Sequence, residues 1–264
     1  MQRCVSLRRM AGVLLGLVLY FLLTVPWVQA ATRTLPKDAK LHPQGWAVGD
    51  LIQFKKGTTV STNDLGEVVS GTLADDTLLQ PRGWERVIDD YYYVSAYTDL
   101  SPYFPRYPRF FAERKYNMAI PGYGHLLYKG GSTVTFSEKG EVLAGTIAEP
   151  ATVRLVAGKY GFVTFKPNTA LAFYDSGALL SGVLDADTNL RPVGWAANNR
   201  ADDSAGFIKF SGKKNVVFSE NGEVISGTLK EPVKWHSTEG PVREFSAQSS
   251  VHFYEQGTAA EKAD

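Results

Sequence analysis

The sequence predicts an all-β protein: an elongated antiparallel array of hairpin repeats, meander or solenoid-like, with one irregular aromatic insertion. Three observations predict this fold class. One motif recurs five times with fixed spacing, its apolar residues alternate with period two, and a glycine follows each alternating stretch at a constant distance. Fixed spacing over several copies is typical of repeat architectures, and alternation is typical of half-buried strands.

Each repeat begins with an aromatic residue, which precedes the first apolar residue of the next strand by six positions and a turn glycine by twelve. The five copies begin at Phe54, Tyr128, Phe165, Phe210 and Phe245. A tight hairpin favours glycine because glycine adopts positive φ without strain, so we expect positive φ at every turn glycine. These turn glycines are Gly66, Gly140, Gly177, Gly222 and Gly257.

The first four copies close on Gly-Thr-Leu or a near variant, as at 71–73 and 227–229. A glycine inside a strand predicts a bulge or a close approach of another part of the chain. Each unit is therefore expected to be a three-stranded meander. A lone meander has a marginal core, so neighbouring units must pack on one another in one long twisted sheet.

Two kinds of tail alternate after the repeats. Long tails end in Leu-x-Pro-x-Gly-Trp, at 79–84 and 190–195, and the segment 41–46 matches them without a preceding repeat. Short tails contain Glu-Pro, at 149–150 and 231–232. Half units at both ends are what a stacked array needs to close. We expect a single β-repeat domain over 31–264, with a partial unit at 33–46 and units near 51–84, 126–155, 162–195, 207–235 and 243–262.

The insertion, residues 85–122, does not follow the repeat. Val87, Tyr91 and Val94 fit one face of a helix, and a tyrosine-rich strand fits equally well. Aromatic and arginine side chains dominate many binding surfaces, and the same side chains also cover exposed sheet edges. Both roles remain open for the candidate binding residues, which are Tyr91, Tyr92, Tyr93, Tyr97, Tyr103, Phe104, Arg106, Tyr107 and Arg109.

Residues 1–30 have the features of a secretory signal peptide. Arginines precede an apolar core at 11–23, Pro26 breaks the helix, and Val28-Gln29-Ala30 supplies small residues for cleavage. The alternative is an uncleaved anchor, since 11–31 is long enough to span a bilayer. Cleavage removes the only cysteine and three arginines, leaving 25 Lys and Arg against 27 Asp and Glu, a net charge of −2. This balance argues against nucleic acid as a partner, and the lack of a thiol excludes disulfides.

No stretch of the chain carries a catalytic or metal-binding signature. The Ser211–Lys214 motif falls in a hairpin turn rather than at a helix start. The segment 185–189 opens like a calcium loop but lacks its glycine and its glutamate, and an Asp recurs at this repeat position (38, 76 and 187), which favours a structural Asx-turn. We therefore expect no cofactor and no metal. The four histidines are scattered, at His42, His125, His236 and His252. Recurring tryptophans are expected in the core, namely Trp46, Trp84 and Trp195.

The repeats resemble two known groups. The segments 136–147 and 218–229 are similar to the repeats of uncharacterised exported bacterial β-repeat proteins that carry the same Gly-Trp tail. Tyr174-Asp175-Ser176-Gly177 and Tyr254-Glu255-Gln256-Gly257 resemble the hairpins of MORN-type repeats. The second resemblance implies a β-hairpin scaffold that binds proteins or lipid rather than one that catalyses.

The sequence thus predicts an exported, non-catalytic binding or scaffold protein, in the periplasm or at the surface of a bacterium. Its partner is expected to be a protein or glycan of the cell envelope, with membrane contact only through an uncleaved signal. The alternative is a glycan-acting enzyme, or its carbohydrate-binding accessory, that uses carboxylates such as Asp89, Asp90 or Asp99. A glycosidase needs two facing carboxylates about 5–10 Å apart.

Overall fold

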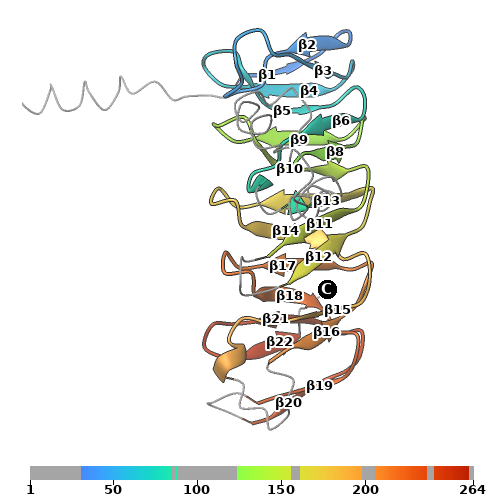
Figure 1. The fold of residues 1–264 in the computed structure, drawn as a ribbon, viewed down its shortest axis with the longest axis vertical. Helices are drawn as coiled ribbons and strands as arrows, with labels where there is room; N and C mark the ends of the chain where they lie inside the picture. Colours follow the sequence, from blue (N-terminus) through green and yellow to red (C-terminus); the bar gives the residue numbers. More distant parts are fainter. Residues whose placement is uncertain are drawn as a thin grey trace, which may run out of the picture.

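The computed structural model describes residues 31–84, 124–155, 161–197, 206–236 and 241–261, together with the backbone of 87–88. The predicted fold class is confirmed: the described chain is all-β, and its antiparallel hairpins stack along one long axis (Figure 1). No helix within these residues has the length and hydropathy needed to cross a membrane.

Each of the first four units contributes four strands to the array, the fifth contributes three in the described chain, and the partial unit at 33–46 supplies the tail strand β2. The first strands are β3 (Ile52–Phe54), β8 (Leu126–Tyr128), β12 (Phe162–Phe165), β16 (Ile208–Phe210) and β20 (Arg243–Phe245). The second strands are β4 (Thr59–Thr62), β9 (Thr133–Phe136), β13 (Thr169–Phe173), β17 (Asn215–Phe218) and β21 (Ser250–Phe253). The third strands are β5 (Val68–Thr72), β10 (Val142–Ile147), β14 (Leu179–Val183), β18 (Val224–Thr228) and β22 (Ala259–Glu261). The tail strands are β2 (Ala39–Leu41), β6 (Thr77–Leu79), β11 (Ala151–Arg154), β15 (Thr188–Leu190) and β19 (Val233–Trp235).

Second and third strands build the long sheet. Its order is β1-β4-β5-β9-β10-β13-β14-β17-β18-β21-β22, where β1 (Ala31–Thr34) pairs with β4. The third strands β5, β10, β14 and β18 therefore pair with the second strand of their own hairpin and with that of the next hairpin, and β22 pairs with β21. We number the hairpins one to five, from β4–β5 to β21–β22.

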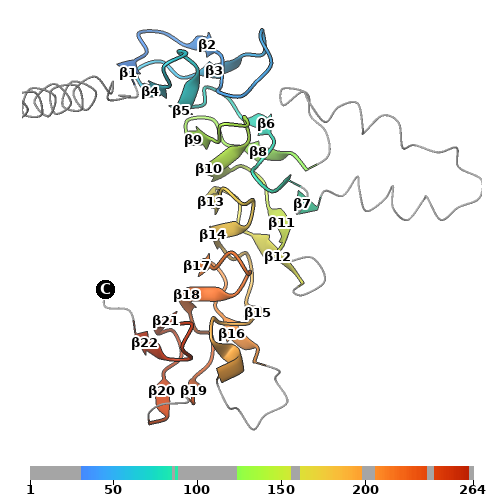
Figure 2. The same ribbon diagram turned by 90° about the vertical axis from the view of Figure 1, so that its left-hand side faces the viewer.

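First strands and tail strands form a second layer of short ribbons. Each tail strand pairs with the first strand of the following unit, giving β2–β3, β6–β8, β11–β12, β15–β16 and β19–β20. The ribbons stand on one side of the long sheet (Figure 2). The expected three-stranded meander is thus modified. The first strand leaves the sheet and touches it only at its last residue, as in the bridges Phe54↔Leu73 and Phe210↔Leu229.

The core lies between the ribbons and the long sheet. In the second unit Tyr128, Val134, Phe136, Val142 and Ile147 point inward and are at most 1% exposed. Alternation places these residues on one face of their strands, as the sequence predicts. Burying a side chain of this size is worth roughly 1.5–3 kcal/mol, so the repeated core supplies most of the favourable free energy of folding.

The glycine of the Gly-Thr-Leu motif makes room for the aromatic residue of the first strand. A Cβ atom on Gly71 would lie 2.7 Å from the Phe54 ring, and one on Gly145 would lie 2.6 Å from the Tyr128 ring. Gly182 and Gly227 have the same relation to the aromatic residues of their own units. The expected close approach is confirmed, and it is the contact that presses the ribbon layer onto the long sheet.

The turns behave as the glycine pattern predicts. All five turn glycines have positive φ, between 77° and 83°. The turn between first and second strands also needs a left-handed residue three positions after the aromatic. Glycine serves in units one and two, and the later units place Asn168, Lys213 and Gln248 there, with φ of 59°, 60° and 67°. Ser211–Lys214 is therefore an ordinary turn, in which the Ser211 hydroxyl donates to the Leu229 carbonyl at 3.0 Å.

The recurring aspartates tie each long tail to the next hairpin. Asp38, Asp76 and Asp187 accept hydrogen bonds from the backbone N–H groups of Lys56, Gly130 and Gly212. The structural role is as predicted, but the bond reaches the following unit instead of closing a local Asx-turn. At Asp187 the Gly212 N–H, and then Lys230, hold the carboxyl pKa below its ordinary value.

Long tails reach across the next two hairpins. In the 79–84 tail, Val142 donates to the Gln80 carbonyl (2.9 Å) and accepts from the Arg82 N–H (2.8 Å). The tails at 41–46 and 190–195 make the same parallel bridge to Val68 and Val224. The glycine near the end of each long tail then contacts the turn of the hairpin that comes after the bridged one. A Cβ on Gly83 would lie 2.8 Å from the Gly177 carbonyl carbon.

Where the tail before a hairpin is short, a tyrosine of that hairpin takes the place of the long tail. Hairpins three and five follow short tails, which make no such bridge, and they carry Tyr174 and Tyr254 where the other hairpins have Asn63, Ser137 and Ser219. The Tyr174 hydroxyl donates to the Phe218 carbonyl at 2.8 Å, as the Gln44 amide of a long tail donates to the Phe136 carbonyl at 2.7 Å. The tyrosine thus replaces the hydrogen bond of the missing tail.

We predict that Tyr174→Phe destabilises the fold by about 1 kcal/mol, since it removes the hydrogen bond to Phe218 and leaves the ring in place. Burial, followed by the negative charge of Glu220, raises the pKa of Tyr174, so its hydroxyl stays protonated and able to donate. Chemical denaturation measures the change. The matched control is Tyr254→Phe, which should be neutral because the Tyr254 hydroxyl makes no hydrogen bond among the described residues. Equal effects at both positions would contradict the assignment.

Replacing Lys213 by Gly should stabilise the protein by roughly 0.5–1 kcal/mol, because it relieves a left-handed backbone at an exposed side chain. The neighbouring Lys214→Gly is the control. Lys214 has ordinary φ, so glycine there only adds entropy to the unfolded chain and should destabilise. Thermal unfolding of both variants decides the matter, and a loss of stability in Lys213→Gly would refute the backbone argument.

Tyr128 holds the position where the other units have Phe, and its hydroxyl is fully buried without a hydrogen-bond partner among the described residues. Burial also raises the pKa of this phenol. Tyr128→Phe should therefore stabilise the fold by about 1 kcal/mol. Phe165→Tyr, the reverse change one unit later, should destabilise it by a similar amount. Denaturant midpoints of the two variants moving in the same direction would show that the hydroxyl is not the cause.

Candidate functional site

The predicted binding residues belong to the insertion, and they lie outside the described residues. This holds for Tyr91, Tyr92, Tyr93, Tyr97, Tyr103, Phe104, Arg106, Tyr107 and Arg109, and for the carboxylates Asp89, Asp90 and Asp99. The structure does describe the residues on which the insertion stands.

The two ends of the insertion meet at Trp84. A Cβ on Gly124, which has φ of +75°, would lie 2.6 Å from the Trp84 carbonyl oxygen and 3.1 Å from its indole ring. The chain therefore returns to the place from which it departs. Gly206 packs on Trp195 in the same way after the 190–195 tail. Trp84 and Trp195 are half-buried, so the predicted core position is wrong for these two, whereas it is confirmed for Trp46, which is 7% exposed.

A short strand fixes the start of the insertion to the ribbon layer. β7 (Val87–Ile88) pairs with β11, with Val87 opposite Val153 and Ile88 opposite Thr152. It covers the free edge of β11 and makes a three-stranded ribbon, β7-β11-β12. Of the helix and strand alternatives for this stretch, these two residues adopt the strand.

The ribbon beside this root has an apolar outer face. Leu78 of β6 and Leu127 of β8 are cross-strand partners, and Leu78 is 38% exposed. The corresponding outward pairs of other ribbons are polar: Lys40↔Gln53, Asn189↔Lys209 and Lys234↔Glu244. Leu78 is exposed and Leu127 is half-buried, so this ribbon has an apolar outer pair where those other ribbons have polar ones.

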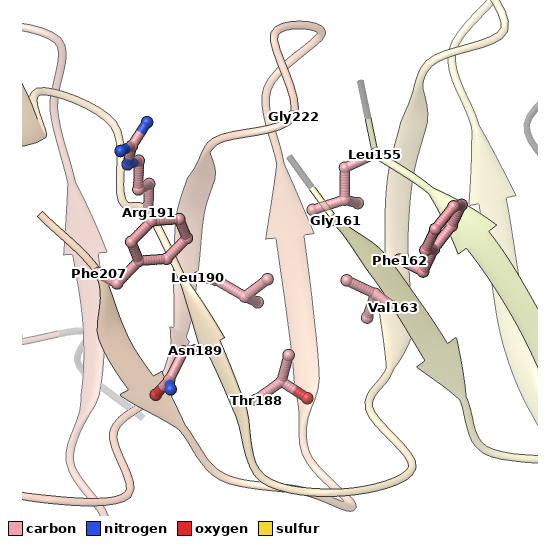
Figure 3. A pocket seen from close by; sticks show the side chains of 10 residues that line it. All are labelled: Leu155, Gly161, Phe162, Val163, Thr188, Asn189, Leu190, Arg191, Phe207 and Gly222. Carbon is pink, nitrogen blue, oxygen red and sulfur yellow. The ribbon is translucent and has the colours of Figure 1, made fainter. Parts of the chain in front are cut away.

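A pocket opens in the ribbon layer, between β12 and β15. We call it the ribbon pocket, and Figure 3 shows Leu190 and Val163 facing each other across it, with Arg191 and Phe207 on the β15–β16 side. Its empty space is about 290 Å³, part of which is open to solvent. The residues that line it are Leu155, Gly161, Phe162, Val163, Thr188, Asn189, Leu190, Arg191, Phe207 and Gly222.

Arginines and aromatic rings surround the mouth of the ribbon pocket. The Arg191 guanidinium lies 4.3 Å from the centre of the Trp195 ring and 4.5 Å from that of Phe207. Arg154 lies 5.1 Å from the ring of Phe162, which is 47% exposed. Such cation–π contacts hold long side chains in place. Sequence analysis missed this site, because its members come from two ribbons and share no motif.

Two of the four histidines have contacts within the array. His42 shares a hydrogen bond of 2.9 Å with the Asp50 carbonyl, and the His252 ring packs at a tilt against that of Tyr254, with 4.6 Å between ring centres. In the part of the chain that the structure covers, no three His, Cys, Asp or Glu side chains converge as metal ligands.

The comparisons with known proteins add no relative: no family model matches the chain, and neither the curated proteins nor the solved structures contain a similar one. The geometry described above is therefore the basis on which function is argued.

Proposed function

We propose that this chain is an exported, non-catalytic binding or scaffold protein of the bacterial envelope, and that its insertion, residues 85–122, contacts the partner. The partner class is a protein or a glycan of the envelope. The observation that carries the proposal is the anchoring of the insertion: both ends meet at Trp84 and Gly124, and β7 is paired with β11.

Anchoring of this kind favours binding because it lowers the entropy lost on association. The array beneath it is rigid, since every hairpin is paired on both sides within the long sheet or closes one end of it. Binding segments are commonly carried by loops that such a scaffold positions. Leu78, which is exposed, and its partner Leu127 add apolar area next to the root of the insertion.

A carbohydrate-binding accessory is the second candidate. The observation that favours it is the exposed Phe162 ring beside Arg154, because aromatic faces with a nearby polar group suit sugar rings. This candidate predicts capture of envelope polysaccharide, whereas the first also allows capture of a protein.

The test is the double substitution Tyr107→Ala with Arg109→Ala in the mature protein. We expect capture of the partner from envelope extract to be lost while the melting temperature is unchanged, since these side chains provide contact area rather than core. The control is Tyr254→Ala with Arg33→Ala, an exposed tyrosine and arginine outside the insertion, which should leave capture intact.

A second variant replaces residues 89–123 by a short Gly-Ser linker. The ends are close, so the linker closes at little entropic cost and the array should remain folded. Full capture by either variant would overturn the proposal. A collapse of the melting temperature in both would show that the insertion is core instead.

A further inference from the structure

The two faces of the long sheet differ in what lies on them. The inner face carries the core and is covered by the ribbons, all of which stand on that one side in the described chain (Figure 2). We call the opposite side of the long sheet the open face. Side chains alternate along a strand, so the neighbours of core residues belong to the open face. On β13, for example, Leu171 is fully buried, and Ala170 and Ala172 on either side of it point outward.

The open face carries no Lys, Arg, Asp or Glu in the described chain, although these residues make up 21% of the sequence. Its cross-strand pairs consist of hydroxyl and small apolar side chains, such as Ser70↔Thr135 and Ala144↔Ala172. Charged side chains lie instead on the ribbons and in the turns, as Lys234 does on β19. A surface that faces only water usually includes charged residues, whereas the centre of a protein interface is depleted of them.

Apolar side chains gather at the middle of the open face, and polar ones lie at its two ends. In the middle, Ala170 and Ala172 lie on β13 and Val217 lies on β17. Leu143 and Leu180 are half-buried there and do not belong to the core cluster. The ends present hydroxyl groups and one imidazole, namely Thr59, Ser61, Ser250 and His252. An apolar centre inside a polar rim is the usual anatomy of a protein–protein interface.

The open face is large enough for a stable interface. Its strands cross the long axis of the molecule from one end to the other (Figure 1). Strands about 4.8 Å apart and about 15 Å long give the eleven strands of the main path a face of roughly 700 Å², and two such faces would bury roughly 1,400 Å² together. Stable protein–protein interfaces bury about 1,200–2,000 Å² in total.

We infer that two copies of this chain pack open face to open face, with hairpin three of one copy over hairpin three of the other. A face without Lys, Arg, Asp or Glu meets its own copy without repulsion between such charges, and a two-fold axis at hairpin three places apolar middle on apolar middle. Two antiparallel sheets pack face to face about 10 Å apart in the same manner inside β-sandwiches. The inference goes beyond the proposed function, because the ribbon layer of both copies stays uncovered.

Sedimentation equilibrium of the mature protein is the first test. We expect a dimer at micromolar concentrations that does not grow further, because each copy has one open face and an isologous contact uses it completely. A monomer at every concentration, or an oligomer that grows with concentration beyond two copies, overturns the inference.

The open face itself is tested by Ala170→Lys. Ala170 is exposed in the single chain, so a lysine fits there without disturbing the fold, but in the dimer it would bury a charge beside the same charge of the second copy. The dimer dissociation constant should rise at least about tenfold, with an unchanged circular dichroism spectrum. Should that variant fail to fold, Thr133→Lys places the same charge at an exposed position of the open face on β9 and should weaken the dimer in the same direction.

The matched control is Ala247→Lys, the same substitution in the turn between β20 and β21. Ala247 is exposed and occupies the repeat position of Lys56 in unit one, so the array already accepts a lysine there. This variant should dimerise normally. An undiminished dimer in the open-face variants, or an equal loss in Ala247→Lys, overturns the assignment of the face.

The linker variant that lacks residues 89–123 separates this inference from the proposed function. We expect it to remain a dimer while it loses capture of the envelope partner. A monomeric linker variant would assign the dimer contact to the insertion and overturn the open-face inference. A dimeric linker variant with full capture would overturn the proposed function alone.

Discussion

The rest of the structure depends on the contact between a ring and a glycine in each unit. The aromatic residue at the end of the first strand lies directly on the third-strand glycine, as Phe165 does on Gly182 at 2.5 Å from a notional Cβ. This contact brings the ribbon close to the sheet at the position where the two backbones form an isolated bridge, as at Phe165↔Leu184. A side chain larger than hydrogen at this glycine would separate the layers and open the core. The constraint explains why a strand interior tolerates a residue that otherwise weakens strands.

Tail length decides what fills the space between successive hairpins. A long tail fills it with backbone, and its amide or carbonyl groups satisfy the first residue of the third strand, as at Val142. A short tail returns early into the next ribbon, and the Tyr174 ring fills the gap with a side chain instead. Alternation of the two solutions makes successive grooves unequal, so an array of similar units presents distinct sites.

Much of the fold was predictable from sequence because period-two alternation and glycine spacing depend only on neighbours along the chain. The strands of each hairpin, the positive φ of Gly140 and its counterparts, and the close approach at Gly145 all follow from such local patterns. Strand partners do not: nothing local shows that Ile52–Phe54 pairs with Ala39–Leu41 and leaves the long sheet. The ribbon pocket could not be predicted from the sequence for the same reason, because Val163 and Leu190 meet only after two ribbons have formed. In the sequence, Tyr174 stands out only as part of the resemblance to MORN-type hairpins. Its structural role is a hydrogen bond to the Phe218 carbonyl, 44 positions away.

The reach of the long tails has a consequence for the order of folding. Trp46 bonds to Gly140 across 94 positions, and Gln44 bonds to Phe136 across 92. Hairpins and neighbouring strands can form as soon as their own residues are available, but these bonds must wait for the unit beyond the next. High sequence separation slows folding because more chain entropy is lost before the contact forms. We therefore expect each unit to pair with its neighbours first. Its long-range tail contacts form only after the second unit beyond it has folded. Its cooperativity extends past nearest neighbours, so damage to one turn also loosens a unit that does not adjoin it.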